Sequence, residues 1–381
     1  MSVQPATPSD ASAAHEPLNV LCVTLGGDRA ESEIFIGLAR RGCRVRICCA
    51  PHNRYVPLFE AAGIRVLRLA FRKRIDLAAI RKLRAELRAE HCDVLYLLHN
   101  RPVSNGLLAV RPFREVKVVV YRGIVGNVGF LSPTSWLRYL NPRIDRVVCV
   151  AEAIRRHFLG MRFLGRRLPP EKFVTVYKGH DLAWYAATPV ELAELGIPSD
   201  AFVVGCVANM RPRKGIEVLV RAFAQLPSEL PIYLLLIGRM QSSKLDAAIA
   251  ANPNSARIRK LGFRPDAPAL IGACDAAALP SLKREGLPRS IIEAMAYGIP
   301  AIVTDVGGSP ELVVHGSSGL VVPPGDADAL AAAVLELYRD PDLRARLGAE
   351  AKRRIAADFN AETTVDQTLH LFRELNGVRA T

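Results

Sequence analysis

Two successive series of alternating strand-like and helix-like segments constrain the fold of this chain most strongly. In the first series, short apolar runs alternate with amphipathic segments, and the second series repeats the pattern after residue 200. Such alternation predicts parallel sheets covered by helices, with ligand sites at the carboxyl ends of the strands. The expected strands are 20–25, 43–49, 64–69, 94–98, 116–121, 146–150, 202–208, 232–237, 256–260, 275–279 and 301–303. The expected helices are 30–41, 55–62, 75–90, 215–225, 243–251, 266–272, 326–338, 341–357 and 361–375.

Residues 178–200 separate the two series, because they contain Gly and Pro and their periodicity is poor. The 381 residues are too many for one typical core and suffice for two domains. We therefore expect an α/β protein with two Rossmann-like parallel-sheet domains facing a central cleft. The predicted boundaries are a disordered tail rich in Ala, Ser and Pro (1–17), two domains (18–185 and 186–360) and a final helical segment (361–381).

The net charge of +14 is concentrated in the first half of the chain. Residues 1–190 contain 30 Lys and Arg against 15 Asp and Glu, whereas residues 191–381 contain 21 against 22. This excess favours a partner with negative charge, either a phospholipid surface, a phosphorylated acceptor or nucleic acid, although solubility alone would also explain it. Nucleic acid is disfavoured because aromatic residues are only 6% of the chain and no aromatic and basic platform is present.

The cysteines and the apolar runs of the chain indicate the cellular compartment in which it works. The eight cysteines are scattered, without a C-x-x-C pair, and several lie in apolar strand-like runs. This usage is typical of a reduced, cytoplasmic protein. No apolar run approaches the roughly 20 residues that a membrane-spanning helix needs, and no secretion signal is evident.

The segment Glu285-Gly-Leu-Pro-Arg-Ser-Ile-Ile-Glu293 carries the strongest functional signal. Pro288 is favoured in the first turn of a helix, so Glu285 should precede the helix and Glu293 should lie within it. A helix N-terminus attracts anions, whereas the two carboxylates would accept hydrogen bonds from hydroxyl groups. A nucleotide diphosphate-sugar combines a diphosphate with a sugar and a ribose, and fits this pattern.

Two other segments point to the same ligand. Thr304-Asp-Val-Gly-Gly-Ser-Pro-Glu311 follows a short strand, and Gly307 and Gly308 would allow close approach of the backbone. In Asn209-Met-Arg-Pro-Arg-Lys-Gly215, cations precede a helix. Lys214 and Arg211 would form a clamp that stabilises charge on a leaving diphosphate.

These three motifs, in their order along the chain, resemble those of the retaining glycosyltransferases of family 4, which have the GT-B fold. The resemblance implies an enzyme that uses a UDP-, GDP- or ADP-sugar, with Glu285 on the transferred sugar and Glu293 on the ribose. It also implies that the last helix returns to the N-terminal domain. The family more often has Arg at the position of Asn209, and we expect Arg211, or alternatively Arg213, to replace that cation. The implied donor site comprises Gly26, Gly27, Asn209, Arg211, Lys214, Phe263, Arg264, Glu285, Gly286, Leu287, Pro288, Glu293, Gly307 and Gly308.

The acceptor side is less defined by the sequence. The resemblance places His99 near the reacting sugar, and Arg122 stands where relatives often have His. Asp28 would contact the acceptor or cap a helix. Trp136, within residues 126–142, suits a membrane interface or a buried helix.

No metal cluster is evident, because Asp326-Ala-Asp328 opens a helix and is better explained by N-capping. No carboxylate nucleophile is evident either, which is compatible with front-face attack.

The predicted function is therefore metal-independent, retaining transfer of a hexose to a cell-surface glycan, either lipopolysaccharide or a lipid-linked oligosaccharide. The protein would be cytoplasmic and peripheral at the inner membrane, with its basic half on the anionic surface. A GT-B sugar-nucleotide epimerase and a non-catalytic scaffold that binds anionic lipid are the alternatives.

Overall fold

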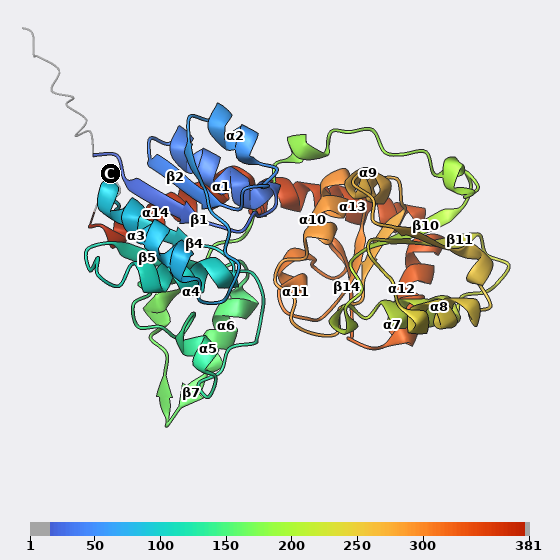
Figure 1. Ribbon diagram of the computed structural model, residues 1–381. Helices are drawn as coiled ribbons and strands as arrows, with labels where there is room; N and C mark the ends of the chain where they lie inside the picture. The colour runs from blue at the N-terminus through green and yellow to red at the C-terminus, as the bar shows by residue number, and fades with distance from the viewer. Residues whose placement is uncertain (1–15, 378–381) are drawn as a thin grey trace, which may run out of the picture.

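The computed structural model describes residues 16–377, which form two α/β lobes (Figure 1). The predicted tail, residues 1–17, lies outside the described residues except for Glu16 and Pro17. Each lobe contains one parallel sheet with helices packed on it, so the predicted architecture of two Rossmann-like domains is confirmed.

The N-terminal lobe contains a seven-stranded parallel sheet in the order β3-β2-β1-β4-β5-β6-β9. Its central strands are buried on both faces, which explains why they are nearly continuous apolar runs. The strands are β1 (Asn19–Val23), β2 (Arg44–Cys49), β3 (Arg65–Arg68), β4 (Val94–Leu97), β5 (Lys117–Arg122), β6 (Arg146–Cys149) and β9 (Phe173–Thr175). The helices are α1 (Arg29–Arg40), α2 (Val56–Ala61), α3 (Leu77–Ala89), α4 (Asn100–Ala109), α5 (Pro133–Trp136) and α6 (Glu152–Gly160). A separate antiparallel hairpin, β7 (Arg162–Phe163) and β8 (Arg166–Arg167), projects from this lobe.

The C-terminal lobe contains a six-stranded sheet in the order β12-β11-β10-β13-β14-β15. In both sheets the chain starts near the centre, moves to one edge and returns to the other side, which creates a crevice at the carboxyl ends of the strands. The strands are β10 (Phe202–Val207), β11 (Ile232–Ile237), β12 (Ile258–Gly262), β13 (Ala276–Leu279), β14 (Ala301–Thr304) and β15 (Gly319–Val322). The helices are α7 (Ile216–Phe223), α8 (Ser243–Ala250), α9 (Ala267–Gly272), α10 (Arg289–Tyr297), α11 (Ser309–Leu312), α12 (Ala327–Arg339) and α13 (Pro341–Asp358). Asp326 caps α12 by accepting from the Ala329 N–H at 2.9 Å, as its position in the sequence predicted.

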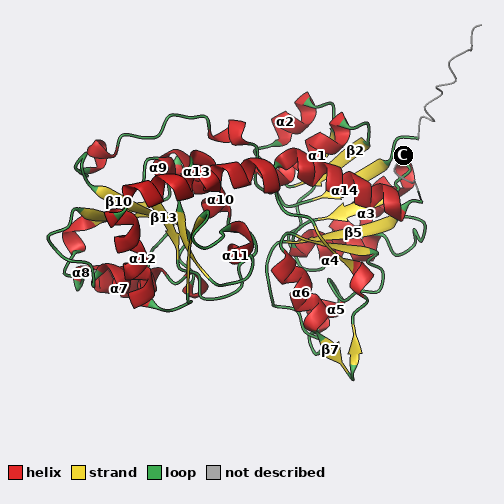
Figure 2. Ribbon diagram, turned by 180° about the vertical axis from the view of Figure 1, so that it is seen from behind, coloured by secondary structure: helices red, strands yellow, loops and turns green. Residues whose placement is uncertain are grey.

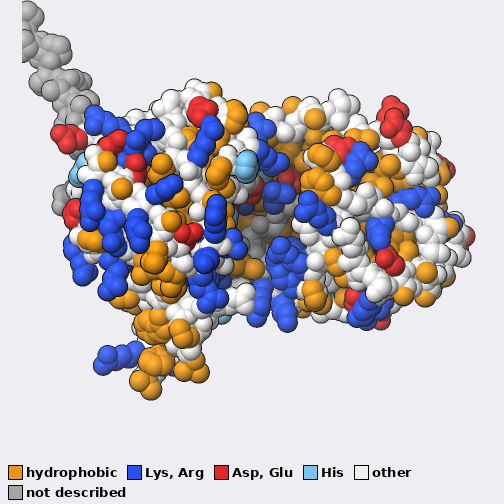
Figure 3. All heavy atoms as spheres, in the orientation of Figure 1, with side chains coloured by type: hydrophobic (Ala, Val, Ile, Leu, Met, Phe, Trp, Pro, Cys, Tyr) orange, Lys and Arg blue, Asp and Glu red, His pale blue; other side chains and the backbone are white. Residues whose placement is uncertain are grey.

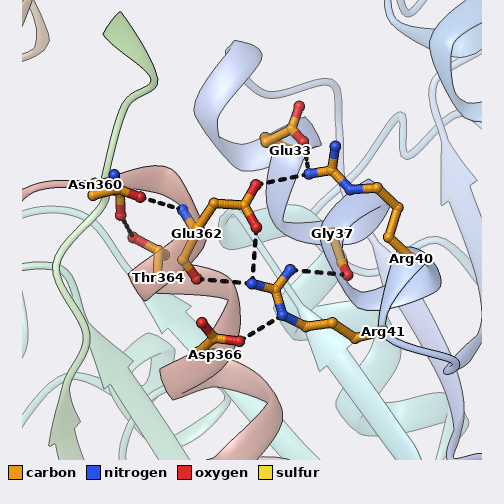
Figure 4. A network of polar contacts seen from close by, with 8 residues as sticks. All are labelled: Glu33, Gly37, Arg40, Arg41, Asn360, Glu362, Thr364 and Asp366. Atoms are coloured by element: carbon orange, nitrogen blue, oxygen red, sulfur yellow. Dashed lines mark hydrogen bonds and ion pairs between the residues drawn. The ribbon is translucent and has the colours of Figure 1, made fainter. Parts of the chain in front are cut away.

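The last helix, α14 (Ala361–Leu375), packs against α1 of the N-terminal lobe. Figure 4 shows the polar part of this contact, in which Arg41 pairs with Glu362 at 2.8 Å and with Asp366 at 2.5 Å. The apolar part is close-packed, because a Cβ added at Gly37 would lie 2.5 Å from Val365 Cγ2. The chain therefore crosses between the lobes twice, once near residues 178–200 and once near residue 360 (Figure 2).

All eight cysteines are buried free thiols. None of the helices within residues 16–377 has the length and apolar character that crossing a bilayer requires.

Candidate functional site in the cleft between the lobes

The space between the two lobes is a cleft rimmed by Lys and Arg side chains (Figure 3). It contains two adjoining cavities, of about 520 and 270 Å³, which share residues of both lobes. The carboxyl ends of both sheets face this cleft, which is where α/β proteins place their ligands. Both cavities are lined by Asp28, Val207, Phe263, Arg264, Ala267 and Arg289. The larger one adds Lys178, Ala208, Asn209, Arg211, Arg213, Lys214, Ile237, Gly238 and Ser290, and the smaller one adds Arg29, Ala30, Arg54, Tyr55, His180, Trp184, Tyr185, Pro265, Pro268 and Glu293.

Glu285 contacts two cations that line the larger cavity, and it is held by three donors. Its Oε1 accepts from Lys214 Nζ at 2.6 Å, from Ser281 Oγ at 3.1 Å and from Arg213 Nη1 at 3.3 Å. Lys214 reaches it from a short turn that ends at Gly215, where φ is +66° and a Cβ would lie 2.1 Å from Pro280 O. Only glycine fits there, and this glycine brings the two motifs together.

Arg211, unlike Arg213 and Lys214, forms no ion pair with a carboxylate of the described residues. It lines the larger cavity. Arg213 lines the same cavity but is already paired with Glu285. A diphosphate in this cavity would therefore find one unpaired guanidinium, Arg211, beside two cations that neutralise Glu285.

Glu293 lies on the second turn of α10 and lines the smaller cavity. It is buried, and Arg289 Nε lies 3.2 Å from its Oε1, one helical turn earlier. Burial raises the pKa of Glu293 to about 7, because the attraction of Arg289 only partly offsets the cost of desolvating the carboxylate. This carboxyl group can therefore change its charge near neutral pH.

Asp28 and Lys178 form the opposite wall, on the N-terminal lobe. Asp28 caps α1 by accepting from the Glu31 N–H at 3.0 Å, and its other oxygen pairs with Lys178 Nζ at 2.7 Å. Although burial opposes it, the Lys178 charge holds the pKa of Asp28 well below its usual range. Asp28 is thus a helix cap and a cavity wall at once.

His99 lies at the strained junction between β4 and α4, with φ at +65°. Its Nδ1 is 3.1 Å from Thr24 Oγ1, and its Nε2 is 3.6 Å from Glu31 Oε2. Burial lowers the pKa of His99 and raises that of Glu31 to about 7. His99 therefore lies beside Gly26 and Gly27, because Thr24 contacts both His99 and Gly26 and Glu31 adjoins Gly27. All of them lie at the edge of the N-terminal sheet that faces the cleft.

Phe263 and Arg264 of the implied donor site line both cavities. Phe263 is 61% exposed, so it does not belong to the core. The guanidinium of Arg239 lies 5.1 Å from the Phe263 ring, and Arg264 pairs with Asp266 at 2.5 Å. Asn209 accepts from the Arg239 N–H at 3.1 Å, which joins two loops of the donor side.

Three glycines of the predicted donor site, Gly286, Gly307 and Gly308, are closely packed, and two of them contact the other lobe. A Cβ at Gly286 would lie 2.4 Å from Gly123 O of the N-terminal lobe, and one at Gly308 would lie 2.8 Å from the Cβ of Ala151. Within the C-terminal lobe, a Cβ at Gly307 would lie 2.1 Å from Glu285 O. Leu287 is buried and Pro288 directly precedes α10.

Glu311, at the end of the Thr304–Glu311 segment, bonds to the other lobe. Its carboxylate accepts from the Glu152 and Ala153 N–H groups at 2.7 and 2.6 Å. These are the first two residues of α6, in the other lobe. Glu311 therefore caps a helix across the domain boundary.

Two predicted acceptor residues, Arg122 and Trp136, line neither cavity. Arg122 is buried, donates to Gly126 O and stacks 4.4 Å from the Tyr139 ring centre. Trp136 is 43% exposed and borders a separate groove on the N-terminal lobe. Neither side chain lines the cleft cavities, but Arg122 directly precedes Gly123, whose carbonyl packs against Gly286 of the predicted donor site.

Sequence reasoning missed Lys178, Arg289, Trp184 and Tyr185, which line the cavities. Lys178 lies in the Tyr-Lys-Gly-His-Asp segment that the sequence marks as a crossover, and Arg289 lies inside the Glu285–Glu293 motif itself. His180, which also lines the smaller cavity, is buried, and its backbone N–H donates to Phe359 O at 2.8 Å. Within residues 16–377, no three His, Cys, Asp or Glu side chains are grouped as a metal site would require.

Both halves of the chain match family models. Residues 188–354 match the model described as Glycosyl transferases group 1, and residues 32–184 match Glycosyltransferase Family 4. The putative colanic acid biosynthesis glycosyltransferase WcaL of Salmonella typhimurium is 32% identical over 54% of this chain and 52% of its own length. The lipopolysaccharide core mannosyltransferase LpcC of Rhizobium leguminosarum is 29% identical over 63% of this chain and 74% of its own. The chain spans about half the length of the first curated relatives it matches.

Solved structures with the same fold cover nearly the whole chain. A glycosyltransferase from Rickettsia africae superposes with a TM-score of 0.80 at 19% identity, covering 95% of this chain and 99% of its own. Anabaena HepE in complex with UDP-glucose gives a TM-score of 0.76 at 24% identity, covering 94% and 100%.

Proposed function

Because this chain belongs to the family 4, group 1 glycosyltransferases of GT-B fold, we propose that it transfers a hexose from a nucleotide diphosphate-sugar to a glycan acceptor. The acceptor would be a lipopolysaccharide or another cell-surface polysaccharide, as the names of WcaL and LpcC suggest. The donor proposal is supported by the complex of Anabaena HepE with UDP-glucose. Transfer would proceed with retention, on the cytoplasmic side of a membrane whose anionic surface attracts the basic N-terminal half.

The observation that carries the proposal is the arrangement of charge in the larger cavity. Lys214, Arg211 and Arg213 approach it from the loop after β10, and Glu285 contacts two of them. The three cations would stabilise the diphosphate as it leaves, which is the stage at which its negative charge increases. Glu285 is fixed by three donors and would orient hydroxyls of the transferred sugar without reorganisation.

The reaction needs no metal in this proposal. The bond between the anomeric carbon and the phosphate oxygen breaks, an acceptor hydroxyl oxygen bonds to the same carbon, and its proton passes to the leaving phosphate. The positive charge that a divalent ion would supply to that phosphate is supplied here by Lys214 and Arg211.

Donor binding tests the proposal directly. Calorimetry with UDP-, GDP- and ADP-sugars, in the presence of EDTA, should identify one preferred nucleotide. Lys214→Ala should weaken its binding by about ten- to a hundredfold, because a charge-assisted contact contributes about 1.5–3 kcal/mol. Lys244→Ala is the matched control, since Lys244 is exposed and pairs only with Glu217 among the described residues. Binding that is unchanged by Lys214→Ala would refute the donor site.

Turnover distinguishes the alternatives. With an acceptor fraction, the protein should release nucleotide diphosphate and extend the glycan, and Glu285→Ala should abolish both. Release of an isomerised sugar without acceptor would indicate an epimerase instead, and absence of any donor binding would favour a non-catalytic lipid-binding scaffold.

A further inference from the structure

The β7–β8 hairpin and residues 130–136 form a projecting tip on the N-terminal lobe, hereafter the tip. In Figure 3 it is a group of hydrophobic side chains at the lower end of this lobe, with Lys or Arg beside it, where Figure 1 places β7. Leu131 is 93% exposed and Leu164 is 88% exposed, and Phe163 and Trp136 are exposed to 40% and 43%. Exposed apolar side chains that gather at one place indicate an interaction surface.

The tip is one packed unit, because its aromatic rings contact each other across two segments. The Phe130 ring centre lies 5.1 Å from that of Phe163 and 6.1 Å from that of Trp136. The Trp136 indole N–H donates to Phe130 O at 2.7 Å. Because this N–H already has an acceptor, burying the rings in an apolar environment would not leave it without a hydrogen-bond partner.

The charged side chains of the tip itself are all positive. Residues 130–136 and 162–167 contain three Arg and no Asp or Glu. In the hairpin, Arg162 lies directly opposite Arg167, and neither forms an ion pair within residues 16–377. Like charges facing each other destabilise a strand pair, and a two-stranded hairpin is marginal by itself. An anionic surface that contacts both arginines would offset this repulsion.

We propose that the tip inserts its apolar end into the interface of an anionic phospholipid bilayer, with Arg162, Arg166 and Arg167 at the level of the lipid phosphates. This combination of apolar end and basic flank is typical of interfacial anchors. A second copy of the chain is a poorer partner, because a symmetric contact would bring two arginine-rich hairpins together. The proposal deepens the proposed function, since it names the part of the chain that meets the membrane.

Vesicle binding tests the tip separately from the donor site. The full chain is sedimented with phosphatidylcholine vesicles, with and without about 30 mol% phosphatidylglycerol, whose negative charge attracts basic segments. The wild type should bind the anionic vesicles, and Leu164→Glu should bind them about tenfold more weakly. Leu58→Glu is the matched control, because Leu58 is 48% exposed on α2 of the same lobe, outside the tip. It should bind as the wild type does.

Tryptophan emission supplies an independent readout. The chain has two Trp, so a blue shift on addition of anionic vesicles that Trp136→Phe removes would assign insertion to the tip. Equal vesicle binding by Leu164→Glu and wild type, or an unshifted emission, would overturn the proposal. So would a dimer in light scattering that Leu164→Glu dissociates.

Donor calorimetry on the same variants keeps the two proposals distinguishable. Leu164→Glu should bind nucleotide-sugar as the wild type does, because the tip does not line the cleft. If neither the wild type nor Leu164→Glu bound a donor, the proposed function would be contradicted. The vesicle experiment would still test the role of the tip independently.

Discussion

Glu293 shows how one buried side chain can make the cleft sensitive to pH. Its carboxyl group faces the smaller cavity, Arg289 is its one ion-pair partner among the described residues, and burial raises its pKa from 4.5 to about 7. Asp28, on the facing lobe, raises the pKa of Glu293, whereas Lys178 lowers it. The charge of the cleft near neutral pH therefore depends on residues from both lobes.

The sign of the resulting effect on stability follows from proton binding. Between pH 4.5 and about 7 the native carboxyl group of Glu293 holds a proton that the unfolded chain has lost, so the free energy of unfolding falls as pH rises through this range. Glu293→Gln stays neutral in both states. We expect its stability, relative to the wild type, to increase by up to about 3 kcal/mol between pH 4.5 and 7.

Urea unfolding of both proteins at several pH values measures this difference. Burial also raises the pKa of Glu31 to about 7, so Glu31 adds a similar pH dependence to the free energy of unfolding of both proteins. This contribution cancels when the free energy of the wild type is subtracted from that of the variant. Glu229→Gln, at an exposed loop position, should track the wild type at every pH. A Glu293→Gln difference that stays constant with pH would contradict the assignment.

At the scale of elements, the loop that contains Gly286 determines how closely the lobes approach. Gly286 leaves no room for a side chain, since a Cβ there would lie 2.4 Å from Gly123 O. Gly286→Ala should therefore separate the lobes slightly while the donor contacts within the C-terminal lobe persist. We expect kcat to fall by about a hundredfold, because displacements near 1 Å have effects of that size, with donor affinity changed far less.

Steady-state kinetics together with donor calorimetry would check this split. Gly160→Ala is the control, because a Cβ at Gly160 meets open space. An equal loss of kcat and of donor affinity would mean that Gly286 acts through the donor site and not through the approach of the lobes.

The elements also show what a sequence can and cannot reveal. The strands β1, β10 and β11 are apolar runs bounded by turn residues, and their positions were predicted to within two residues. Helix α4 was missed because it starts at strained His99 without a capping side chain and contains Pro102 and Gly106. Helix α6 was missed for a different reason, since its cap is Glu311, which lies more than 150 residues later in the chain.

The candidate site was likewise predicted where local motifs define it and missed where distant segments meet. The sequence brought Glu285, Lys214 and Arg211 to one place, because each belongs to a local motif at the end of a strand. It did not reveal that Arg213 shares Glu285, or that Lys178 faces Arg289 across the cleft. The first relation depends on how two loops of the C-terminal lobe pack together, and the second depends on how the two lobes meet. No local pattern encodes either of them.

At the scale of the whole molecule, α14 completes the core of a lobe whose other elements precede residue 178. Phe372 is fully buried there, and its ring lies 5.4 Å from that of Tyr96 on β4. Phe372→Ala should destabilise the N-terminal lobe by about 3–5 kcal/mol, the usual cost of removing a buried aromatic ring.

Thermal unfolding followed by calorimetry would report the effect as an earlier transition of the N-terminal lobe. Glu374→Ala is the control, because Glu374 is exposed and its ion pair with Arg146, at 3.3 Å, is a surface pair expected to contribute at most about 1 kcal/mol. Equal transitions in Phe372→Ala and wild type would show that the lobe does not depend on this helix.

The return of α14 also has a consequence for how the protein is made. Domains usually fold one after another as they leave the ribosome, the N-terminal one first. Here the first-made sheet lacks part of its core until residues 361–375 have been synthesised, and by then the second lobe is already complete. The lobe translated first would be the lobe that finishes folding last, and a nonsense mutation anywhere before codon 361 would leave it exposed to chaperones and proteases.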